Sequence, residues 1–246
     1  MNNKEIQEFW LKNGYYNEQI LSDEEVELYR EETRKLFKEK PTSPYKNPTE
    51  DSELLIDLMK HPRVLELVSI CMEADLGIQN VKVDALQTWM YLKPPGELGR
   101  DIHQNIFYTH ANRGDIINTS IALNDADRDN GGLFVYPGSQ HEWCLPITVD
   151  EDRMRTNPIG WNNERGKPCV LPGEWVDGEW KDKYEKVYTN AKAGSVSLIH
   201  SHIIHGSEEN TSPDRWRTAF LTAYLRQGAH FIQGNDMKRK KIAVYD

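Results

Sequence analysis

The chain has 246 residues, of which 38% are hydrophobic and 28% are charged, and its formal net charge at pH 7 is −9. This composition can bury a core and excludes an intrinsically disordered chain. The acidic balance argues against a nucleic-acid-binding protein, because phosphate contacts need a basic surface. We take residues 1–246 as a single domain, since the length suits one β-rich domain and nothing demands two.

Targeting and cysteine signals are weak in this chain. Its N-terminus lacks the apolar segment of a signal peptide, and no stretch reaches the roughly 18 apolar residues that a membrane span requires. Its three cysteines lie far apart without a CxxC spacing, so neither a disulfide framework nor a thiolate zinc site is indicated. We therefore expect a cytoplasmic protein without membrane contacts.

The apolar pattern of the first 76 residues predicts helices. Three segments repeat apolar residues at helical spacing: 2–14, 22–38 and 61–77. Ser22 and Glu25 form a capping-box pattern at the start of the second segment, while Gly14 and Gly77 stand where C-terminal caps are expected. We expect these helices to cover one side of a sheet.

From residue 78 the apolar period changes from 3.6 to 2, which indicates strands. The predicted strands are 84–93, 102–109, 116–124, 133–139, 186–191, 195–200 and 217–226. Many strands without intervening helices predict an antiparallel sandwich or barrel, so residues 78–246 should form a barrel. The glycine-rich "DNGGLFVYPGS" lacks the lysine and helix of a phosphate-binding loop, and we interpret it as a turn followed by a strand.

Residues 148–184 interrupt the strand pattern with Pro and Gly clusters and with Trp161, Trp175 and Trp180. A connection of that length inside a domain is usually a functional lid or a disordered insert, and the aromatic residues favour the lid. We expect this insertion to close over a ligand.

Histidines are the residues most suggestive of chemistry. Of eight in the chain, His103 lies in "DIHQNIFYTH", and three more occur in "SLIHSHIIHGSEENTSPDRWR". Two histidines and one carboxylate with open positions are the pattern of non-haem Fe(II) oxygenases. The two histidine stretches lie about a hundred residues apart, which is consistent with opposite strands of a barrel. Asn105, two residues after His103, would share its strand face but is not a carboxylate.

Four stretches in order resemble the signatures of the phytanoyl-CoA dioxygenase family: "LKPPGELGRDIHQNIFY", "IALNDADRDNGGLFVYPGSQHE", "AGSVSLIHSHIIHGSEENTSPDRWRTAF" and "GNDMKRK". The resemblance runs from about residue 10 to the C-terminus. It implies a mainly β fold with flanking helices, the double-stranded β-helix (jelly roll, cupin-like). It also implies Fe(II) as cofactor, 2-oxoglutarate as cosubstrate, and O2 with a small molecule as the reacting partners.

The resemblance assigns the ligand positions. The family's first iron histidine falls on His103, and the second falls on His205 rather than on the two earlier histidines of that stretch. Arg217 matches the arginine that pairs with the distal carboxylate of 2-oxoglutarate, a role suited to a planar bidentate fork. Arg215, two residues earlier, is its competitor.

Three further positions are candidate cosubstrate contacts. Tyr108 matches the family tyrosine near 2-oxoglutarate, and Ser207 could donate a hydrogen bond to the cosubstrate. Gln87 lies on the polar face of its strand, where related proteins have a pocket-facing residue. As alternatives, Tyr108 is a barrel-lining aromatic and Gln87 an exposed strand residue.

Asn105 departs from the family, which has Asp at this iron-ligand position. Its amide oxygen could still coordinate iron as a neutral, weaker donor. Alternatively the position is left for a halide, as in similar enzymes that chlorinate carbon, although Asn is larger than the residues found there. A third account is lost iron chemistry or a deliberate Asp-to-Asn change. Asp101 is a possible substitute ligand from the other side of His103.

The function that follows is hydroxylation at carbon of a small-molecule metabolite by an Fe(II)- and 2-oxoglutarate-dependent dioxygenase. The alternatives are a 2-oxoglutarate-dependent halogenase and a catalytically disabled small-molecule binding protein of the same fold. A zinc hydrolase is a further rival, but the chain has no HExxH helix. The substrate itself is not legible from the sequence.

Overall fold

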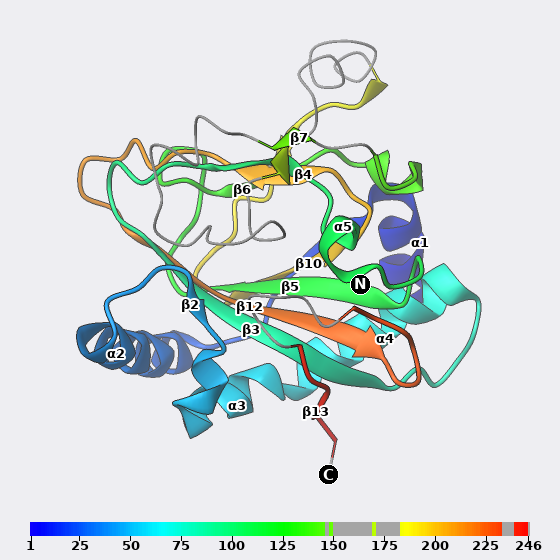
Figure 1. The fold of residues 1–246 in the computed structure, drawn as a ribbon, viewed down its shortest axis with the longest axis horizontal. Helices are drawn as coiled ribbons and strands as arrows, with labels where there is room; N and C mark the ends of the chain where they lie inside the picture. Colours follow the sequence, from blue (N-terminus) through cyan, green and yellow to red (C-terminus); the bar gives the residue numbers. More distant parts are fainter. Residues whose placement is uncertain (146–147, 150–168, 171–182, 233–238, 246) are drawn as a thin grey trace.

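Figure 1 presents a computed structural model of the chain, which describes residues 1–145, 148–149, 169–170, 183–232 and 239–245. The predicted lid falls almost entirely outside the described residues, including Trp161, Trp175 and Trp180. Of that insertion the structure describes the paired strands β7 (Thr148–Val149) and β8 (Cys169–Val170), and residues 183–184.

The three predicted N-terminal helices are confirmed. They are α1 (Asn3–Asn13), α2 (Asp23–Glu39) and α4 (Pro62–Leu76). Ser22 and Glu25 form the reciprocal capping box of α2, and Gly14 and Gly77 cap α1 and α4 with left-handed backbone conformations. The sequence reading missed the short helix α3 (Glu53–Met59) and the 3-10 turn Pro48–Glu50.

The larger sheet is antiparallel and has the strand order β1-β10-β5-β12-β3-β13, with β2 paired to β3. Its strands are β1 (Tyr15–Gln19), β2 (Tyr45–Lys46), β3 (Val83–Lys93), β5 (Ile116–Ala122), β10 (Ser195–His200), β12 (Arg217–Arg226) and β13 (Ile242–Ala243). The four long strands match predicted segments.

The smaller sheet has the order β4-β11-β6-β9. Its strands are β4 (Arg100–His103), β6 (Leu133–Val135), β9 (Val187–Tyr188) and β11 (His205–Ser207). These strands are short, so periodicity gave only approximate positions for three of them and none for β11.

The helices α2 and α3 lie on the opposite side of the larger sheet from the smaller sheet (Figure 1). The main apolar core fills the helical side, where Met90, Ile121, Leu198 and Phe220 of four strands pack with helical residues such as Trp10. Side chains alternate along a strand, so the intervening residues face the smaller sheet. The space between the sheets is therefore lined from both sides by strand residues.

The strand predicted over 102–109 is partly wrong. β4 ends at His103, and Asn105 has helical backbone angles, φ −69° and ψ −26°, ahead of the single-turn helix α5 (Ile106–Thr109). The strand predicted over 133–139 also ends early, at Val135, and is followed by the 3-10 turn Ser139–His141. His103 and Asn105 therefore do not share a strand face by simple alternation.

The described strands form two facing sheets and a separate two-stranded ribbon rather than a closed barrel. Facing antiparallel sheets with flanking helices are the expected jelly-roll arrangement in open form. Within the described part of the chain, no helix has both the length and the apolar character of a membrane span.

Candidate functional site

His103 and His205 are brought together by strand pairing. His103 ends β4, His205 begins β11, and the two residues are direct antiparallel partners. Their ring centroids lie 4.3 Å apart, and both side chains are buried. The hundred-residue gap between the two histidine stretches is thus closed by one ladder of the smaller sheet.

Each imidazole is held in a defined tautomer by a backbone carbonyl. Nδ1 of His103 lies 2.6 Å from the Asp101 carbonyl oxygen, and Nδ1 of His205 lies 3.0 Å from that of Ile203. A carbonyl can only accept, so each Nδ1 carries the proton and each neutral ring has its lone pair on Nε2. Both rings therefore present an Nε2 suited to a metal ion.

Burial favours the neutral form of both rings. Desolvation lowers the pKa of His103 well below its usual value, and the electrostatic effects of His205 and of the charged Arg100 act in the same direction. Desolvation likewise lowers the pKa of His205 to about 4. At neutral pH the two side chains bind no proton that a metal ion would have to displace.

The side chain of Asn105 forms a hydrogen bond with His103 that favours the protonated imidazole, against the larger effect of burial. Among the described residues no group of three or more His, Cys, Asp or Glu side chains is arranged to hold a metal ion. Asp101 is therefore not brought together with the two histidines as a substitute carboxylate.

Two of the three candidate ligands fit an iron site, and the third, Asn105, differs from the carboxylate of the usual pattern. Neutral imidazoles are suitable iron ligands. Each ring here also forms a hydrogen bond through Nδ1 to a backbone carbonyl, the kind of contact that orients a metal-ligating histidine. An amide oxygen is a neutral and weaker donor than a carboxylate. The residues present could hold Fe(II) through His103 and His205, with Asn105 beside them.

Arg217 is buried on the face of β12 that looks toward the smaller sheet. Its guanidinium donates to the carbonyl of Gly131 over 3.1 Å, and no described carboxylate forms an ion pair with it. Desolvation lowers its pKa to about 10, an effect only partly opposed by Tyr91. A buried guanidinium that donates to a single carbonyl among the described residues is suited to an incoming carboxylate.

Arg215, the competing arginine, lies on the surface. Its two terminal nitrogens bind the carboxylate of Asp127 at 2.6 and 2.9 Å, and 42% of its side chain is exposed. The structure therefore directs Arg217, and not Arg215, into the interior.

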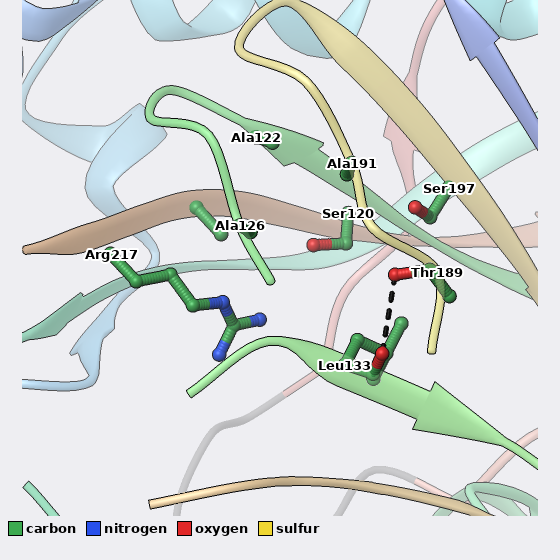
Figure 2. A pocket seen from close by; sticks show the side chains of 9 residues that line it. Ser120, Ala122, Ala126, Leu133, Thr189, Ala191, Ser197 and Arg217 are labelled. Carbon is green, nitrogen blue, oxygen red and sulfur yellow. Dashed lines mark hydrogen bonds between the residues drawn. The ribbon is translucent and has the colours of Figure 1, made fainter. Parts of the chain in front are cut away.

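A cavity adjoins the Arg217 side chain, and its lining consists mostly of small residues: Ser120, Ala122, Ala126, Leu133, Thr189, Ala191, Ser197, Arg217 and Ala219. Figure 2 shows the guanidinium extending from the larger sheet toward the strand that carries Leu133. A hydrogen bond from the Thr189 hydroxyl to the Leu133 carbonyl fixes the opposite wall. The cavity has a volume of about 10 Å³, which is the size of a single water site.

Ser207 lies two residues after His205 in β11, so the two side chains share a strand face. Two residues of extended chain span roughly 6.6 Å, which is comparable to the length of a five-carbon dicarboxylate. The hydroxyl of Ser207 accepts hydrogen bonds from the backbone N–H of Arg100 and from Lys93. The hydroxyl group of Ser207 thus lies on the same face of the smaller sheet as His205.

Gln87 is buried, so the alternative of an exposed strand residue is wrong. Gln87 and Asn118 flank Ala223 in one row across three strands. The Gln87 side-chain oxygen and the Asn118 side-chain nitrogen are buried without a hydrogen-bond partner among the described residues. Such groups are costly unless a ligand or water satisfies them, which marks this row as a polar site between the sheets.

Tyr108 lies in α5, directly beside the first histidine. Its ring centroid is 6.0 Å from that of His103 in an edge-on arrangement. This placement is compatible both with a lining aromatic and with a residue close to a bound cosubstrate.

Gln104 is a residue whose part in the site was not predicted from the sequence. Its side-chain nitrogen donates to the carbonyls of His202 and Trp143, and its oxygen accepts the backbone N–H of Leu145. Gln104 thereby ties the end of β4 to the turn that precedes His205. The position of this polar residue between the candidate ligands His103 and Asn105 was the sequence signal that could have pointed to it.

Comparison with known proteins gives a consistent picture. A family model described as phytanoyl-CoA dioxygenase (PhyH) matches residues 12–219. L-Proline trans-4-hydroxylase from Streptomyces griseoviridis is 31% identical over 128 residues, which cover 50% of this chain and 47% of that protein. Ectoine dioxygenase from Nocardia farcinica is 24% identical over 230 residues, covering 83% of this chain and 71% of the relative. The match thus spans about half the length of the proline hydroxylase.

Solved structures show the same fold. The epimerase SnoN in complex with Fe3+, alpha ketoglutarate and nogalamycin RO superposes with a TM-score of 0.72 at 18% identity, covering 93% of this chain and 85% of that one. At this identity the likeness concerns the fold alone. The two facing sheets and their flanking helices therefore have the same fold as that structure.

Proposed function

The chain belongs to the phytanoyl-CoA dioxygenase family, and we propose that it is an Fe(II)- and 2-oxoglutarate-dependent dioxygenase that hydroxylates a small-molecule metabolite at carbon. The observation that carries the proposal is the cross-strand pair His103 and His205, buried, neutral and with Nε2 unprotonated. The family's iron and cosubstrate chemistry requires this kind of donor pair.

Each candidate residue has a defined task in this proposal. His103 and His205 hold Fe(II) through Nε2, and Asn105 contributes a neutral amide beside them. Arg217 takes the distal carboxylate of 2-oxoglutarate as a fork, and Ser207 donates its hydroxyl proton to the same carboxylate.

The remaining contacts shape the pocket. Tyr108 forms a wall next to His103, while Gln87 offers its unsatisfied oxygen to a bound molecule. When bound, Fe(II) and 2-oxoglutarate supply the O2-dependent oxidation of a carbon–hydrogen bond, with succinate and carbon dioxide as the other products. The protein orients the reactants and limits water around them.

The polar row of Gln87 and Asn118 favours a small polar substrate. Two buried amides, one with a free acceptor and one with a free donor, complement a molecule that has both kinds of group. The named relatives include a proline hydroxylase and an ectoine dioxygenase, which supports a small polar metabolite for this chain too.

Halogenation is less well supported. The side chain of Asn105 stays within hydrogen-bonding reach of His103, so the position is occupied by an amide rather than left open for a halide. The proposed enzyme therefore hydroxylates, and chloride or bromide should not change its product.

The test is an anaerobic Fe(II) titration with 2-oxoglutarate, followed by measurement of succinate after oxygen is admitted. The proposal expects a visible charge-transfer band and succinate formation in the wild type, with both greatly reduced in His205→Ala. Arg215→Met is the matched control and should behave like the wild type. A wild type that forms neither band nor succinate would leave a binding protein as the better description.

A further inference from the structure

The histidine-rich stretch before β11 contains a second buried histidine, His200, which the proposed function does not use. It ends β10 and is 1% exposed. Its ring centroid lies 5.8 Å from that of Trp10 in α1, so the side chain packs against the helices and not between the two sheets. Burying a polar ring is costly unless its nitrogens are satisfied, so the contacts of the two ring nitrogens indicate what His200 does.

The tautomer of His200 follows from its contact with the backbone. Nδ1 accepts a hydrogen bond from the backbone N–H of His202 over 3.0 Å. A backbone N–H can only donate, so Nδ1 carries no proton. Burial lowers the pKa of His200 to about 3, and the electrostatic effects of His202, Arg113 and His141 act in the same direction. The ring is therefore neutral at neutral pH, and its one proton is on Nε2.

Asp75, near the end of α4, faces the Nε2 side of this ring. Its Oδ2 accepts the indole N–H of Trp10 over 2.9 Å and lies 3.5 Å from Nε2 of His200. Burial raises the pKa of Asp75 to about 6, so most of the carboxyl group is ionised at neutral pH. Nε2 has no hydrogen-bond partner among the described residues. A carboxylate at this distance favours a proton on Nε2, which is the tautomer that leaves Nδ1 able to accept.

The turn 201–204 follows His200 directly and is fixed by it. The backbone N–H of His202 donates to Nδ1 of His200, and the N–H of Ile203 donates to its carbonyl over 3.1 Å. The carbonyl of Ile203 in turn accepts the Nδ1 proton of His205 over 3.0 Å. Two hydrogen bonds to His200 therefore hold the turn whose carbonyl orients the candidate ligand His205.

The same turn contacts residues next to the other two candidate ligands. The carbonyl of His202 accepts the side-chain N–H of Gln104 over 2.7 Å, and the carbonyl of Ser201 accepts the backbone N–H of Ile106 over 2.9 Å. Gln104 directly follows His103, and Ile106 begins α5, directly after the third candidate ligand. Three consecutive carbonyls of the turn thus reach all three parts of the candidate metal site.

We propose that His200 is a positioning residue for the metal site: its unprotonated Nδ1 holds the turn 201–204, and the carbonyls of that turn hold the candidate ligands in place. Asp75 maintains the required tautomer from α4. The helical layer thereby supports the metal site through one imidazole, although neither residue touches the metal. This inference rests on the proposed function, because it concerns how the ligands of that same site are held.

The experiment is a Mn(II) titration of the wild type, His200→Asn and His200→Gln, with the free ion measured by electron paramagnetic resonance. The amide oxygen of Asn can take the place of Nδ1 and still accept the N–H of His202, whereas the amide of Gln lies further out, toward the place of Nε2. His200→Gln should bind Mn(II) about tenfold more weakly than the wild type, and His200→Asn should stay close to it. His230→Gln, at an exposed histidine, is the matched control and should bind like the wild type.

Urea denaturation of the same variants distinguishes positioning from packing. Asn is smaller than Gln and leaves the larger cavity in place of the imidazole, so His200→Asn should be the less stable of the two variants. A residue that only fills space would therefore lose more metal affinity as Asn than as Gln. The positioning role predicts the opposite order of Mn(II) affinity, with His200→Asn tighter than His200→Gln.

The wild type supplies a second measurement that does not depend on whether the variants fold. Nitrogen-15 NMR reports which ring nitrogen of a histidine carries the proton. At neutral pH the spectrum of His200 should show a protonated Nε2 and an unprotonated Nδ1. The opposite tautomer, or a charged ring, overturns the inference.

The outcomes separate the two proposals. A wild type that binds no Mn(II) overturns the proposed function and this inference with it. A wild type that binds Mn(II), together with a His200→Gln variant of equal affinity, overturns the role of His200 alone. A Mn(II) affinity that is lower in His200→Asn than in His200→Gln would mean that His200 only packs the core, which also overturns the inference.

Discussion

Replacing Arg217 by Met should stabilise the ligand-free protein while removing its affinity for 2-oxoglutarate. Burial lowers the pKa of Arg217 to about 10, from an ordinary value of about 12.5. At about 1.4 kcal/mol for each pH unit, the charged guanidinium costs the folded state on the order of 3 kcal/mol. The folded pKa lies below the unfolded one, so this cost is fully present at neutral pH and fades only above about pH 10.

Part of that gain is offset by lost contacts. The hydrogen bond to Gly131 contributes about 1 kcal/mol, and Met fills a similar volume. The expected net result is a free energy of unfolding about 1 to 2 kcal/mol higher in Arg217→Met without ligand. The wild type should gain about 2.7 kcal/mol when 2-oxoglutarate is present at a hundred times its dissociation constant, and the variant should gain almost nothing.

The assay is urea denaturation at pH 7.5, with and without 2-oxoglutarate and Mn(II). Arg215→Met is the control, because it removes a charge from an exposed ion pair and should leave the free energy of unfolding close to that of the wild type. A ligand-free Arg217→Met that is clearly less stable than the wild type would refute the reasoning, since the guanidinium would then already be compensated. Retained stabilisation by 2-oxoglutarate in the variant would refute the assigned carboxylate contact.

Three further predictions concern single residues. Asn105→Asp should bind Fe(II) about tenfold more tightly or better, because a charged ligand replaces a neutral one; anaerobic competition with a chelating dye measures this, and equal affinity would count against Asn105 as a neighbour of the metal. Burial raises the pKa of Asp75 to about 6, so the folded state holds the carboxyl proton more tightly than the unfolded state does. As the pH rises from about 4 to about 6, the free energy of unfolding of the wild type should therefore fall by up to about 3 kcal/mol relative to that of Asp75→Asn. Urea denaturation at several pH values tests it, and an opposite slope contradicts it. Gly131→Ala places a Cβ against Lys93 at a φ of +80°, so it should lower stability by about 1 to 3 kcal/mol and weaken 2-oxoglutarate binding; calorimetry tests both effects, and an unchanged variant refutes the close approach.

The helical flank was predictable because its signals are local. Ser22 and Glu25 cap α2 in the way their spacing indicates, and Gly14 ends α1 in the left-handed conformation that glycine adopts most easily. Long strands such as β3 and β12 were equally clear, since alternation over ten or more residues is a strong pattern.

Short elements depended on tertiary pairing that the sequence does not reveal. β1 exists as a strand because Tyr15–Gln19 pair with β10, and β11 is only three residues long between two partners. The predicted strand across Asn105 failed for a related reason. Its backbone turns into α5, where Ile106 packs into a second apolar cluster, and that burial outweighs the local preference for extended chain.

The same limit explains why the family resemblance gave His103, His205 and Arg217 but not Lys93. The predicted strand 84–93 ends at Lys93 and the glycine pair at 131–132 is predicted as a turn, and neither prediction is wrong as local structure. Alternation along β3 does place Lys93 on the face of Gln87, toward the smaller sheet, and a lysine on an inward face is an uncommon residue that requires a partner. What alternation cannot supply is the second element, because Gly131 and Ser207 reach Lys93 only through the packing of the smaller sheet against the larger one. A buried lysine on an inward strand face should therefore be treated as a candidate anion contact until the residues opposite it are known.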